Sequence, residues 1–315
     1  MNKNVLIPID VSDSGKDYLL SRGYTLKILN DSSVEYICHE IGDCAAVLGR
    51  FGSYPAEIFE AAPELKIFAK HGTGTDDIDL ATAAEHGVIV TNTPEANAGC
   101  VAEHTIGMML ACVQDIVQMD RKIRDGEFTA ARKKLTGEVN GMILGLVGFG
   151  RIARETAKKA ALGLGMNVLF WNRSKVTDVP EYAVQVEDLD TLLVQSDVIS
   201  LHVPYAPGTH HLVDRKALSA MKSTAVLLNL SRGGLVDEEA LYEALRGNQI
   251  ASAGLDCFEL EPTASDNPLL SLDNIIVTPH GAGLGTKSAS RMSLHAAMCI
   301  DDVLQGREPK WRVRS

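Results

Sequence analysis

Residues 145 to 153 read Gly-Leu-Val-Gly-Phe-Gly-Arg-Ile-Ala and lie in the middle of a chain of 315 residues. Gly148, Gly150 and Ala153 form a Gly-x-Gly-x-x-(Gly/Ala) turn. The turn follows an apolar run, 142–147, that predicts a buried strand, and it opens a segment with the small-residue pattern of a packed helix. A strand, a glycine turn and a helix N-terminus in this order are typical of a site for the pyrophosphate of a dinucleotide.

Short apolar segments alternate with helical patterns on both sides of this turn, which predicts an α/β fold with doubly wound parallel sheets. The expected strands before the turn are 5–9, 26–29, 46–48, 66–69 and 88–91. The expected strands from the turn onward are 142–147, 167–171, 198–203, 225–230, 251–255 and 274–278. Long helices are expected at 101–124 and 287–304.

Composition and charge exclude several classes of function. The net charge of −11 means that the protein as a whole repels nucleic acid and anionic membrane surfaces. The most apolar segment, 101–119, contains Glu103, His104 and Asp115, so we expect a core or interface helix there and no membrane span. The six cysteines show no metal-ligand spacing, which favours a cytoplasmic protein with reduced thiols and no metal. The first strand follows Met1 so closely that we expect no signal peptide.

Side chains capable of chemistry follow the expected strands of the second half directly. Arg232, Asp256 and His280 each come shortly after such a strand, and His202 lies at the end of another. The carboxyl ends of parallel strands meet at one edge of a sheet, and ligands bind outside that edge. We therefore expect these side chains to lie close together.

Three segments carry a more specific pattern. They are 229–237 (Asn-Leu-Ser-Arg-Gly-Gly-Leu-Val-Asp), 254–262 (Gly-Leu-Asp-Cys-Phe-Glu-Leu-Glu-Pro) and 278–283 (Thr-Pro-His-Gly-Ala-Gly). Behind a mid-chain glycine turn, they resemble the D-isomer-specific 2-hydroxyacid dehydrogenase family, which includes phosphoglycerate dehydrogenases and glyoxylate and hydroxypyruvate reductases. The segments 70–79 and 201–204 extend the resemblance over nearly the whole chain. It implies an enzyme that transfers a hydride between NAD(P)H and a small 2-keto or D-2-hydroxy acid.

The resemblance also accounts for the late position of the glycine turn. The alternation of strand and helix patterns is interrupted by a loop near 93–99 and again by a glycine-containing segment at 281–285. We predict a discontinuous, flavodoxin-like substrate domain formed by 1–98 and 286–315. A Rossmann cofactor domain, 99–285, is inserted into it.

The resemblance assigns roles to the polar residues of these segments. Arg232 would hold the substrate carboxylate or the polarised keto oxygen through its planar donor fork. His280 would protonate the keto oxygen, and Glu261 would hydrogen-bond the other ring nitrogen of His280. The backbone N–H groups of Thr73 and Gly74 would bind the substrate carboxylate, since glycine allows close approach.

The cofactor would contact residues after several strands of the second half and one residue of the helix at 101–124. The expected contacts are Thr105, Gly148, Phe149, Gly150, Arg151, Ile152, Asn172, Arg173, Ser174, Lys175, His202, Val203, Pro204, Thr209, Leu230, Ser231, Asp256 and Gly281. Among them, Asp256 would bind the nicotinamide carboxamide.

The end of the strand at 167–171 bears on the choice of cofactor. NAD-specific domains place an acidic residue there, which binds the ribose 2′-hydroxyl and repels a 2′-phosphate. Here Asn172 takes that place, and Arg173 and Lys175 supply cations. We therefore predict a preference for NADP over NAD. The alternative is that both cations point to solvent and the selectivity is slight.

The substrate is less sharply indicated. Arg50 is the one arginine in the segment 47–53, where phosphoglycerate-type relatives can carry two. We favour reduction of glyoxylate or hydroxypyruvate, and the alternative activities are those of a phosphoglycerate dehydrogenase or a formate- or phosphite-type dehydrogenase.

A non-catalytic NAD(P)-sensing corepressor is a further alternative, although this compact chain lacks the extra tails that such proteins usually carry. A short-chain dehydrogenase is disfavoured, because no tyrosine has a lysine four residues on. Relatives lead us to expect a homodimer.

Overall fold

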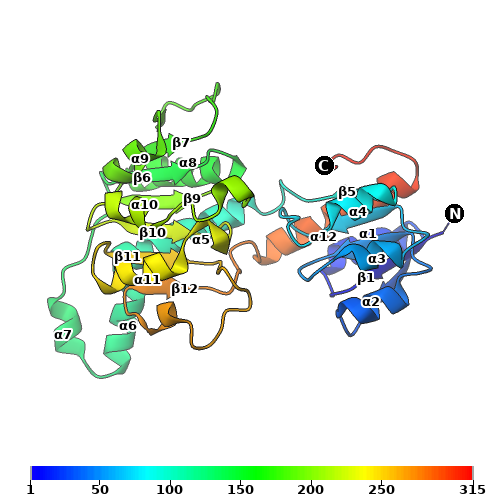
Figure 1. Ribbon diagram of the computed structural model, residues 1–315, viewed down its shortest axis with the longest axis horizontal. Coiled ribbons are helices and arrows are strands. Elements are labelled where there is room, and N and C mark those ends of the chain that lie inside the picture. Colours follow the sequence, from blue (N-terminus) through cyan, green and yellow to red (C-terminus); the bar gives the residue numbers. More distant parts are fainter. Residues whose placement is uncertain (1, 314–315) are drawn as a thin grey trace. The chain divides into compact units, whose positions relative to one another are not determined.

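The computed structural model describes residues 2–313, which divide into two units, each built around a parallel sheet (Figure 1). The first unit comprises Met1–Ala98 and Gly283–Ser315, and the second comprises Gly99–Ala282. The predicted class, α/β with two parallel-sheet domains, is confirmed. The chain returns to the first unit at residue 283, whereas the prediction placed this return at 286.

The sheet of the first unit has the strand order β2-β1-β3-β4-β5, and every pairing in it is parallel. Its strands are β1 (Asn4–Ile7), β2 (Thr25–Ile28), β3 (Ala46–Gly49), β4 (Ile67–Lys70) and β5 (Ile89–Thr91). Its helices are α1 (Asp13–Ser21), α2 (Val34–Glu40), α3 (Ala56–Glu60), α4 (Leu80–Glu85) and α12 (Thr286–Leu304). All five strands lie within two residues of the predicted segments. The central strands β3 and β4 are buried throughout, as expected where helices cover both faces of a parallel sheet.

Helix α12 comes from the far end of the sequence and packs against α1, β3 and β4. The approach to α1 is close, because a Cβ on Gly15 would lie 2.3 Å from Ser293 Oγ. The buried carboxylate of Asp301 accepts a hydrogen bond from the Tyr24 hydroxyl at 2.9 Å and pairs with Arg307 Nη2 at 2.6 Å. The core of the first unit therefore contains residues from both of its chain segments.

The sheet of the second unit has the strand order β12-β11-β10-β9-β6-β7-β8 and is also parallel. Its strands are β6 (Ile143–Val147), β7 (Asn167–Trp171), β8 (Ala183–Gln185), β9 (Val198–Leu201), β10 (Val226–Asn229), β11 (Ser252–Leu255) and β12 (Ile275–Val277). Its α-helices are α5 (Ala98–Val113), α6 (Ile116–Arg124), α7 (Phe128–Lys133), α8 (Arg151–Leu164), α9 (Leu189–Gln195), α10 (Arg215–Ala220) and α11 (Glu238–Arg246). Short 3-10 helices lie at η1 (Pro207–Thr209), η2 (Gly233–Leu235) and η3 (Pro268–Ser271). The strand order reverses beside β6, where doubly wound sheets bind their ligands.

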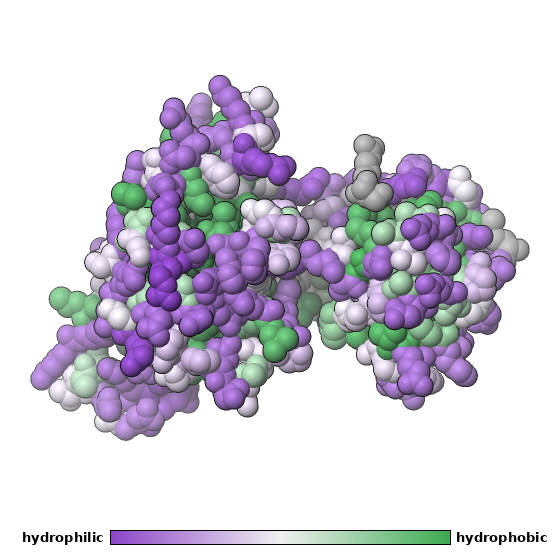
Figure 2. All heavy atoms as spheres, in the orientation of Figure 1, coloured by the Kyte–Doolittle hydropathy of each residue, from purple (hydrophilic) through white to green (hydrophobic). Residues whose placement is uncertain are grey.

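Two cores lie on opposite faces of this second sheet. Helices α9, α10 and α11 contribute Leu192, Leu218 and Leu241 to one core, and α5 and α8 contribute Met108 and Ala157 to the other. The apolar pattern that predicted the strands therefore corresponds to burial from both sides. On the face shown in Figure 2, hydrophilic side chains and apolar patches alternate on both units.

Two predictions for this unit need correction. The helix predicted at 101–124 is two helices, α5 and α6, which are bent by 59° at a short break. Asp115 has a left-handed backbone (φ 51°) at this break, a conformation that Asp adopts more readily than most residues. The edge strand β8 was not predicted, because a three-residue strand has too few positions to show alternation.

No single helix among residues 2–313 is long and apolar enough to span a membrane, and α5 with α6 meets that criterion only as a bent pair.

Candidate active site

The glycine turn joins β6 to α8 in the way the sequence predicted. Gly148 has φ 94°, which favours glycine, and a Cβ there would lie 2.8 Å from the carbonyl oxygen of His202. Gly150 is the N-cap of α8 and offers no side chain to the first-turn N–H groups. Ala153 is fully buried in the core beneath the turn. A Cβ on Gly150 would meet nothing within 4 Å, so the turn leaves open space in front of the first-turn N–H groups of α8, as a dinucleotide pyrophosphate requires.

The loop after β7 contains the residues predicted to select the cofactor. Asn172 Nδ2 donates to the carbonyl oxygen of Ser174 at 3.0 Å, and Gln185 Nε2 donates to the same oxygen at 3.1 Å. Arg173 and Lys175 are exposed, and within residues 2–313 neither side chain makes a hydrogen bond or ion pair. Two side-chain amides thus hold the backbone of the loop, and the side chains of Arg173 and Lys175 can bind an anion.

The residues after β9 and β10 are joined to each other. Ser231 Oγ donates to the carbonyl oxygen of Val203 at 3.0 Å, which links the ends of the two strands. His202 Nε2 lies 3.0 Å from Ser200 Oγ, and burial lowers the pKa of His202 to about 4. His202 is therefore neutral at physiological pH.

Two other residues predicted to contact the cofactor, Thr105 and Thr209, donate their hydroxyl groups to backbone carbonyls of the second unit. The buried Thr105 hydroxyl donates to the carbonyl oxygen of Val101 at 2.8 Å, inside α5. The Thr209 hydroxyl donates to the carbonyl oxygen of Pro204 at 2.9 Å and so closes the loop after β9. Leu230 is buried at the end of β10. These contacts organise the local backbone.

Arg232 lies in a tightly constrained loop between β10 and η2. Its Nη1 donates to the carbonyl oxygen of Ser231 at 2.6 Å, and its own carbonyl accepts from the buried Asn229 Nδ2 at 2.8 Å. At the next residue, Gly233, a Cβ would lie only 1.9 Å from the backbone carbonyl of Phe258. The loops after β10 and β11 are therefore in direct backbone contact, which sets the position of Arg232 relative to the loop after β11.

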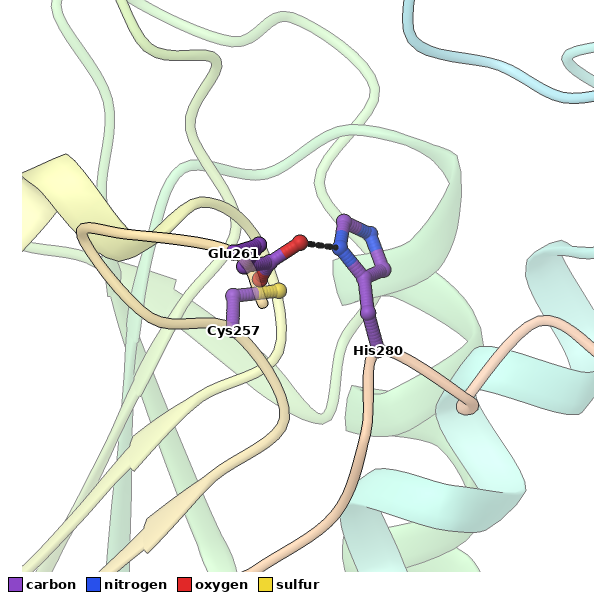
Figure 3. Close-up of side chains that lie close together, drawn as sticks. All are labelled: Cys257, Glu261 and His280. Carbon is purple, nitrogen blue, oxygen red and sulfur yellow. Dashed lines mark hydrogen bonds and ion pairs between the residues drawn. The ribbon is translucent and has the colours of Figure 1, made fainter. Parts of the chain in front are cut away.

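Glu261 and His280 form a hydrogen-bonded pair across the loops after β11 and β12 (Figure 3). Glu261 Oε2 lies 2.7 Å from His280 Nδ1, and Oε1 accepts from the N–H of Phe258 at 2.9 Å. Partial burial by itself raises the pKa of Glu261, but the hydrogen bonds from His280 and Phe258 outweigh it, with help from the positive charge of Arg232, and the pKa is lowered. Glu261 is therefore a carboxylate near neutral pH, oriented toward the imidazole.

His280 itself has a left-handed backbone, with φ 51°, and its loop is held by Asp256. The Asp256 carboxylate is buried and accepts from Thr278 Oγ1 at 2.5 Å, Gly281 N at 2.8 Å and Ala282 N at 2.9 Å. The His280 N–H donates to the carbonyl oxygen of Asp256 at 2.8 Å. Asp256, predicted as a contact of the nicotinamide carboxamide, therefore already serves as the anchor of the His280 loop.

The same network reaches helix α5 through a residue that the sequence reasoning passed over. Thr278 Oγ1 lies 3.2 Å from His104 Nε2, so the hydroxyl connects α5 to Asp256. Its place two residues before His280 was the one sign in the sequence that Thr278 could belong to the site. The sequence does not show that its hydroxyl donates to Asp256, and without this partner no positioning role can be assigned to it.

Cys257 also lies in this site, although its sequence context gave no metal-ligand or redox signal. Its Sγ donates to the carbonyl oxygen of Ser231 at 3.4 Å, the same oxygen that Arg232 contacts. Burial, reinforced by the carboxylates of Asp256 and Glu261, raises the pKa of the Cys257 thiol well above its usual range. The thiol is therefore protonated and is no nucleophile in the protein alone.

The residues predicted to bind substrate in the first unit follow β3 and β4. Arg50 Nη1 donates to the carbonyl oxygen of Asp10 at 3.3 Å. The Thr73 hydroxyl donates to Asn97 Oδ1 at 3.1 Å, which fixes the loop after β4. The backbone N–H groups of Thr73 and Gly74 donate to no other residue in the part of the chain that the structure describes. Two adjacent amides with no protein acceptor can bind a carboxylate.

Comparison with known proteins finds one consistent group of relatives. Residues 106–282 match the family model described as the NAD binding domain of D-isomer specific 2-hydroxyacid dehydrogenases. The chain is 44% identical over 240 residues to a hydroxypyruvate reductase of Thermotoga maritima, covering 75% of this chain and 76% of that protein. It is 39% identical over 266 residues to a glyoxylate reductase of Korarchaeum cryptofilum, covering 83% of this chain and 80% of that protein.

A longer relative is a D-3-phosphoglycerate dehydrogenase of Archaeoglobus fulgidus, to which the chain is 36% identical over 305 residues. This match covers 96% of the chain but 57% of the relative, so the chain spans little more than half of that protein's length.

Solved structures give the same result. A protein of Thermus thermophilus superposes with a TM-score of 0.92 at 35% identity, covering 99% of this chain and 100% of that one. An NADPH-dependent glyoxylate/hydroxypyruvate reductase of Sinorhizobium meliloti, in complex with NADP and malonate, has a TM-score of 0.88 at 26% identity, covering 99% of this chain and 97% of that one. A D-lactate dehydrogenase of Lactobacillus jensenii with NAD+ has a TM-score of 0.83 at 25% identity, covering 99% and 100%.

Proposed function

The chain belongs to the D-isomer specific 2-hydroxyacid dehydrogenase family of NAD(P)-dependent oxidoreductases, and we propose that it reduces a small 2-keto acid to the D-2-hydroxy acid. One observation carries this proposal. Glu261 and His280 pair at 2.7 Å in the loops after β11 and β12, and Arg232 follows the neighbouring strand β10. A carboxylate-oriented imidazole beside a guanidinium is the set of groups needed to bind and protonate a keto acid.

Each residue of this set has a separate task. NAD(P)H, when bound, supplies the hydride that is transferred to C2 of the keto acid. His280 donates a proton to the keto oxygen from Nε2, because Nδ1 faces Glu261, and the oxygen becomes the product hydroxyl. Glu261 orients the ring through its hydrogen bond with Nδ1. Arg232 attracts the substrate carboxylate or the negative charge that develops on the keto oxygen.

The residues of the first unit extend the proposal to substrate binding. The amides of Thr73 and Gly74 donate to no acceptor within residues 2–313, and we assign them to the substrate carboxylate. Arg50 is the one cation of its segment and supports a small, unphosphorylated substrate. Glyoxylate or hydroxypyruvate fits best, in agreement with the names of the Korarchaeum and Thermotoga relatives. Phosphoglycerate dehydrogenase is the second candidate, because the Archaeoglobus relative aligns with 96% of the chain.

NADP is the cofactor that we propose as preferred. The loop after β7 offers two exposed cations, Arg173 and Lys175, and an amide, Asn172, where an acidic side chain would repel a 2′-phosphate. The Sinorhizobium relative is NADPH-dependent, whereas the Lactobacillus relative was solved with NAD+. The local charge of the loop therefore supports the preference more strongly than the relatives do.

We also propose that the enzyme is a cytoplasmic homodimer. Ile116 and Ile123 of α6 are 49% and 47% exposed and Phe128 of α7 is 59% exposed, which supports burial of these apolar side chains against a second copy. All six cysteines carry free thiols, which supports a reducing compartment. Size-exclusion chromatography with light scattering tests the dimer, and a monomer at micromolar concentration would contradict it.

The decisive experiment measures NADPH oxidation with glyoxylate, hydroxypyruvate and phosphohydroxypyruvate. We expect turnover with the first two acids and a loss of about 10²–10⁴-fold in kcat for His280→Ala. His86→Ala, at an exposed histidine of the first unit, is the matched control and should retain full activity. A marked preference for phosphohydroxypyruvate would favour the second candidate. Failure to oxidise NADPH with any keto acid would favour a binding protein without catalytic activity.

A further inference from the structure

Three side chains of different chemistry converge where the loops after β11 and β12 meet (Figure 3). Cys257, Glu261 and His280 place a sulfur, a carboxylate oxygen and an imidazole nitrogen within 4.8 Å of one another. The proposed reaction uses Glu261 and His280 but gives Cys257 no task. We propose that these three residues form an inhibitory site for a thiophilic divalent cation such as Zn²⁺, which stops turnover by occupying the acid–base pair. Inhibition of turnover by the cation rests on the proposed function, whereas binding of the cation to these three residues does not.

The donor set selects the kind of cation. Zn²⁺ binds thiolate, imidazole and carboxylate groups, and three protein ligands leave a fourth tetrahedral position for water. Mg²⁺ and Ca²⁺ require oxygen ligands, so a sulfur in a set of three disfavours them. Cd²⁺ shares the preference for sulfur and serves as a spectroscopic probe of the same site.

The geometry is close to what a tetrahedral cation needs. Zn–S bonds of about 2.3 Å and Zn–N or Zn–O bonds of about 2.0–2.2 Å place neighbouring ligand atoms roughly 3–4 Å apart. The observed limit of 4.8 Å therefore requires side-chain shifts on the order of 1 Å. The hydrogen bond of 2.7 Å between Glu261 and His280 must open as the cation takes the place of the proton between them. The Cys257 thiol must also release its proton to solvent, because cysteine binds Zn²⁺ as the thiolate.

The site is both held in place and open to solvent. The side chains of His280 and Glu261 are 48% and 37% exposed, so a cation can reach them from solution. Cys257 is buried beneath them, with its Sγ directed at the carbonyl oxygen of Ser231 at 3.4 Å. Glu261 Oε1 is held by the N–H of Phe258, which leaves Oε2 as the ligand atom. The three ligand atoms therefore lie within 4.8 Å of one another before any cation binds.

Occupation of the site removes the groups on which the proposed reaction depends. A cation bound to both residues replaces the hydrogen bond through which Glu261 orients His280. Cys257→Ala removes one ligand without touching either residue, so this variant separates cation binding from turnover. The residue change is small, and it should leave metal-free kcat and KM unchanged.

Direct binding is measured with Cd²⁺, because a cadmium–thiolate bond gives an ultraviolet charge-transfer band. Wild-type protein in the reduced state should develop this band with one cation per chain, and Cys257→Ala should lose it. Cys38→Ala is the matched control, since Cys38 is a half-buried thiol in the other unit, and it should keep the band. A band of equal intensity in Cys257→Ala, or no band in the wild type, would overturn the proposal.

Activity gives the second readout. Zn²⁺ should inhibit the wild type reversibly, with recovery on addition of EDTA, and Cys257→Ala should need roughly tenfold or more Zn²⁺ for the same inhibition. Equal sensitivity of both proteins would contradict the inference even if turnover is normal. If no keto acid is reduced, the proposed function fails, but the Cd²⁺ titration still decides whether the site exists. Cys257→Val, checked by circular dichroism, replaces the alanine variant if that variant does not fold.

Discussion

The N–H of His280 donates to the carbonyl oxygen of Asp256 at 2.8 Å, and the buried carboxylate of Asp256 holds the two residues that follow His280. His280 has a left-handed backbone, which is less favourable for a residue with a side chain, so its orientation depends on such bonds. The position of the proposed acid is therefore set by a residue that directly follows the neighbouring strand β11.

Replacement of Asp256 by Asn should lower kcat for keto-acid reduction by about 100-fold. The amide cannot accept from both Gly281 N and Ala282 N without turning its NH₂ group toward a donor, so the His280 loop shifts. Steady-state kinetics should show little change in the KM for the keto acid. Thr278→Val, which removes one donor to Asp256, should have a smaller effect of the same kind, and Thr278→Ser should restore activity.

The opposite pattern for Asp256→Asn would point to another role. If kcat is retained and the KM for NADPH rises, Asp256 binds the nicotinamide carboxamide and the loop tolerates the change.

Replacement of Gly233 by Ala should destabilise the second unit by about 3 kcal/mol, because the new methyl group would overlap the backbone of Phe258 and Glu259. Urea unfolding measured by circular dichroism tests this. Gly107→Ala is the matched control: Gly107 is an exposed glycine within α5, and a Cβ there has nothing within 4 Å. That change should stabilise by about 0.5–1 kcal/mol. Equal stability of the two variants would show that the loops can separate at little cost.

Replacement of Arg173 by Ala should lower kcat/KM for NADPH by roughly 10–100-fold and leave kcat/KM for NADH unchanged, since a charge-assisted bond to the 2′-phosphate would be lost. Asn172→Asp should also shift the preference from NADPH toward NADH, because the new carboxylate would repel the same phosphate. Arg215→Ala, at an exposed arginine of α10, is the control and should change neither value. A preference for NADH that Arg173→Ala does not alter would refute the assignment of NADP.

The first unit should lose stability between pH 6.5 and pH 4 because of His71. Burial, with the nearby cations Arg50 and Lys70, lowers the pKa of His71 to about 4, and hydrogen bonds with the backbone oppose this only in part. The unfolded chain takes up a proton near pH 6.5 while the folded protein does not, so stability falls as pH falls through this window. The full contribution is about 3 kcal/mol.

Urea unfolding at about pH 7.5, 5.5 and 4.5 measures this dependence. His71→Asn should flatten it, whereas His86→Asn, at an exposed histidine, should not. An unchanged slope in His71→Asn would assign the acid sensitivity to other groups.

Much of the fold could be predicted from the sequence, because strands buried on both faces are continuous apolar runs. All five strands of the first sheet and six of the second were predicted, and β8 was missed because an edge strand of three residues carries no such run. The break between α5 and α6 was missed for a different reason. The left-handed turn at Asp115 interrupts the helix backbone without interrupting the helical pattern of apolar residues.

The candidate site was predictable only in part. The pairing of Glu261 with His280 was expected from the resemblance, and the structure places these two residues 2.7 Å apart. The approach of Cys257 to the pair depends on how two loops fold back, which local sequence does not encode. The anchoring of Asp256 by Thr278 depends on contacts between neighbouring strands, so it too required the structure.

The return of α12 to the first unit imposes an order on synthesis. When residue 98 leaves the ribosome, β1 to β5 are complete, but the helix that packs against α1 and fills part of their core ends about 200 residues later. At translation rates of about 5–20 residues per second, the delay is roughly 10–40 s. The second unit, although made later, has all of its strands before α12 emerges. The first unit therefore cannot complete its core until α12 has been made, after every strand of the second unit.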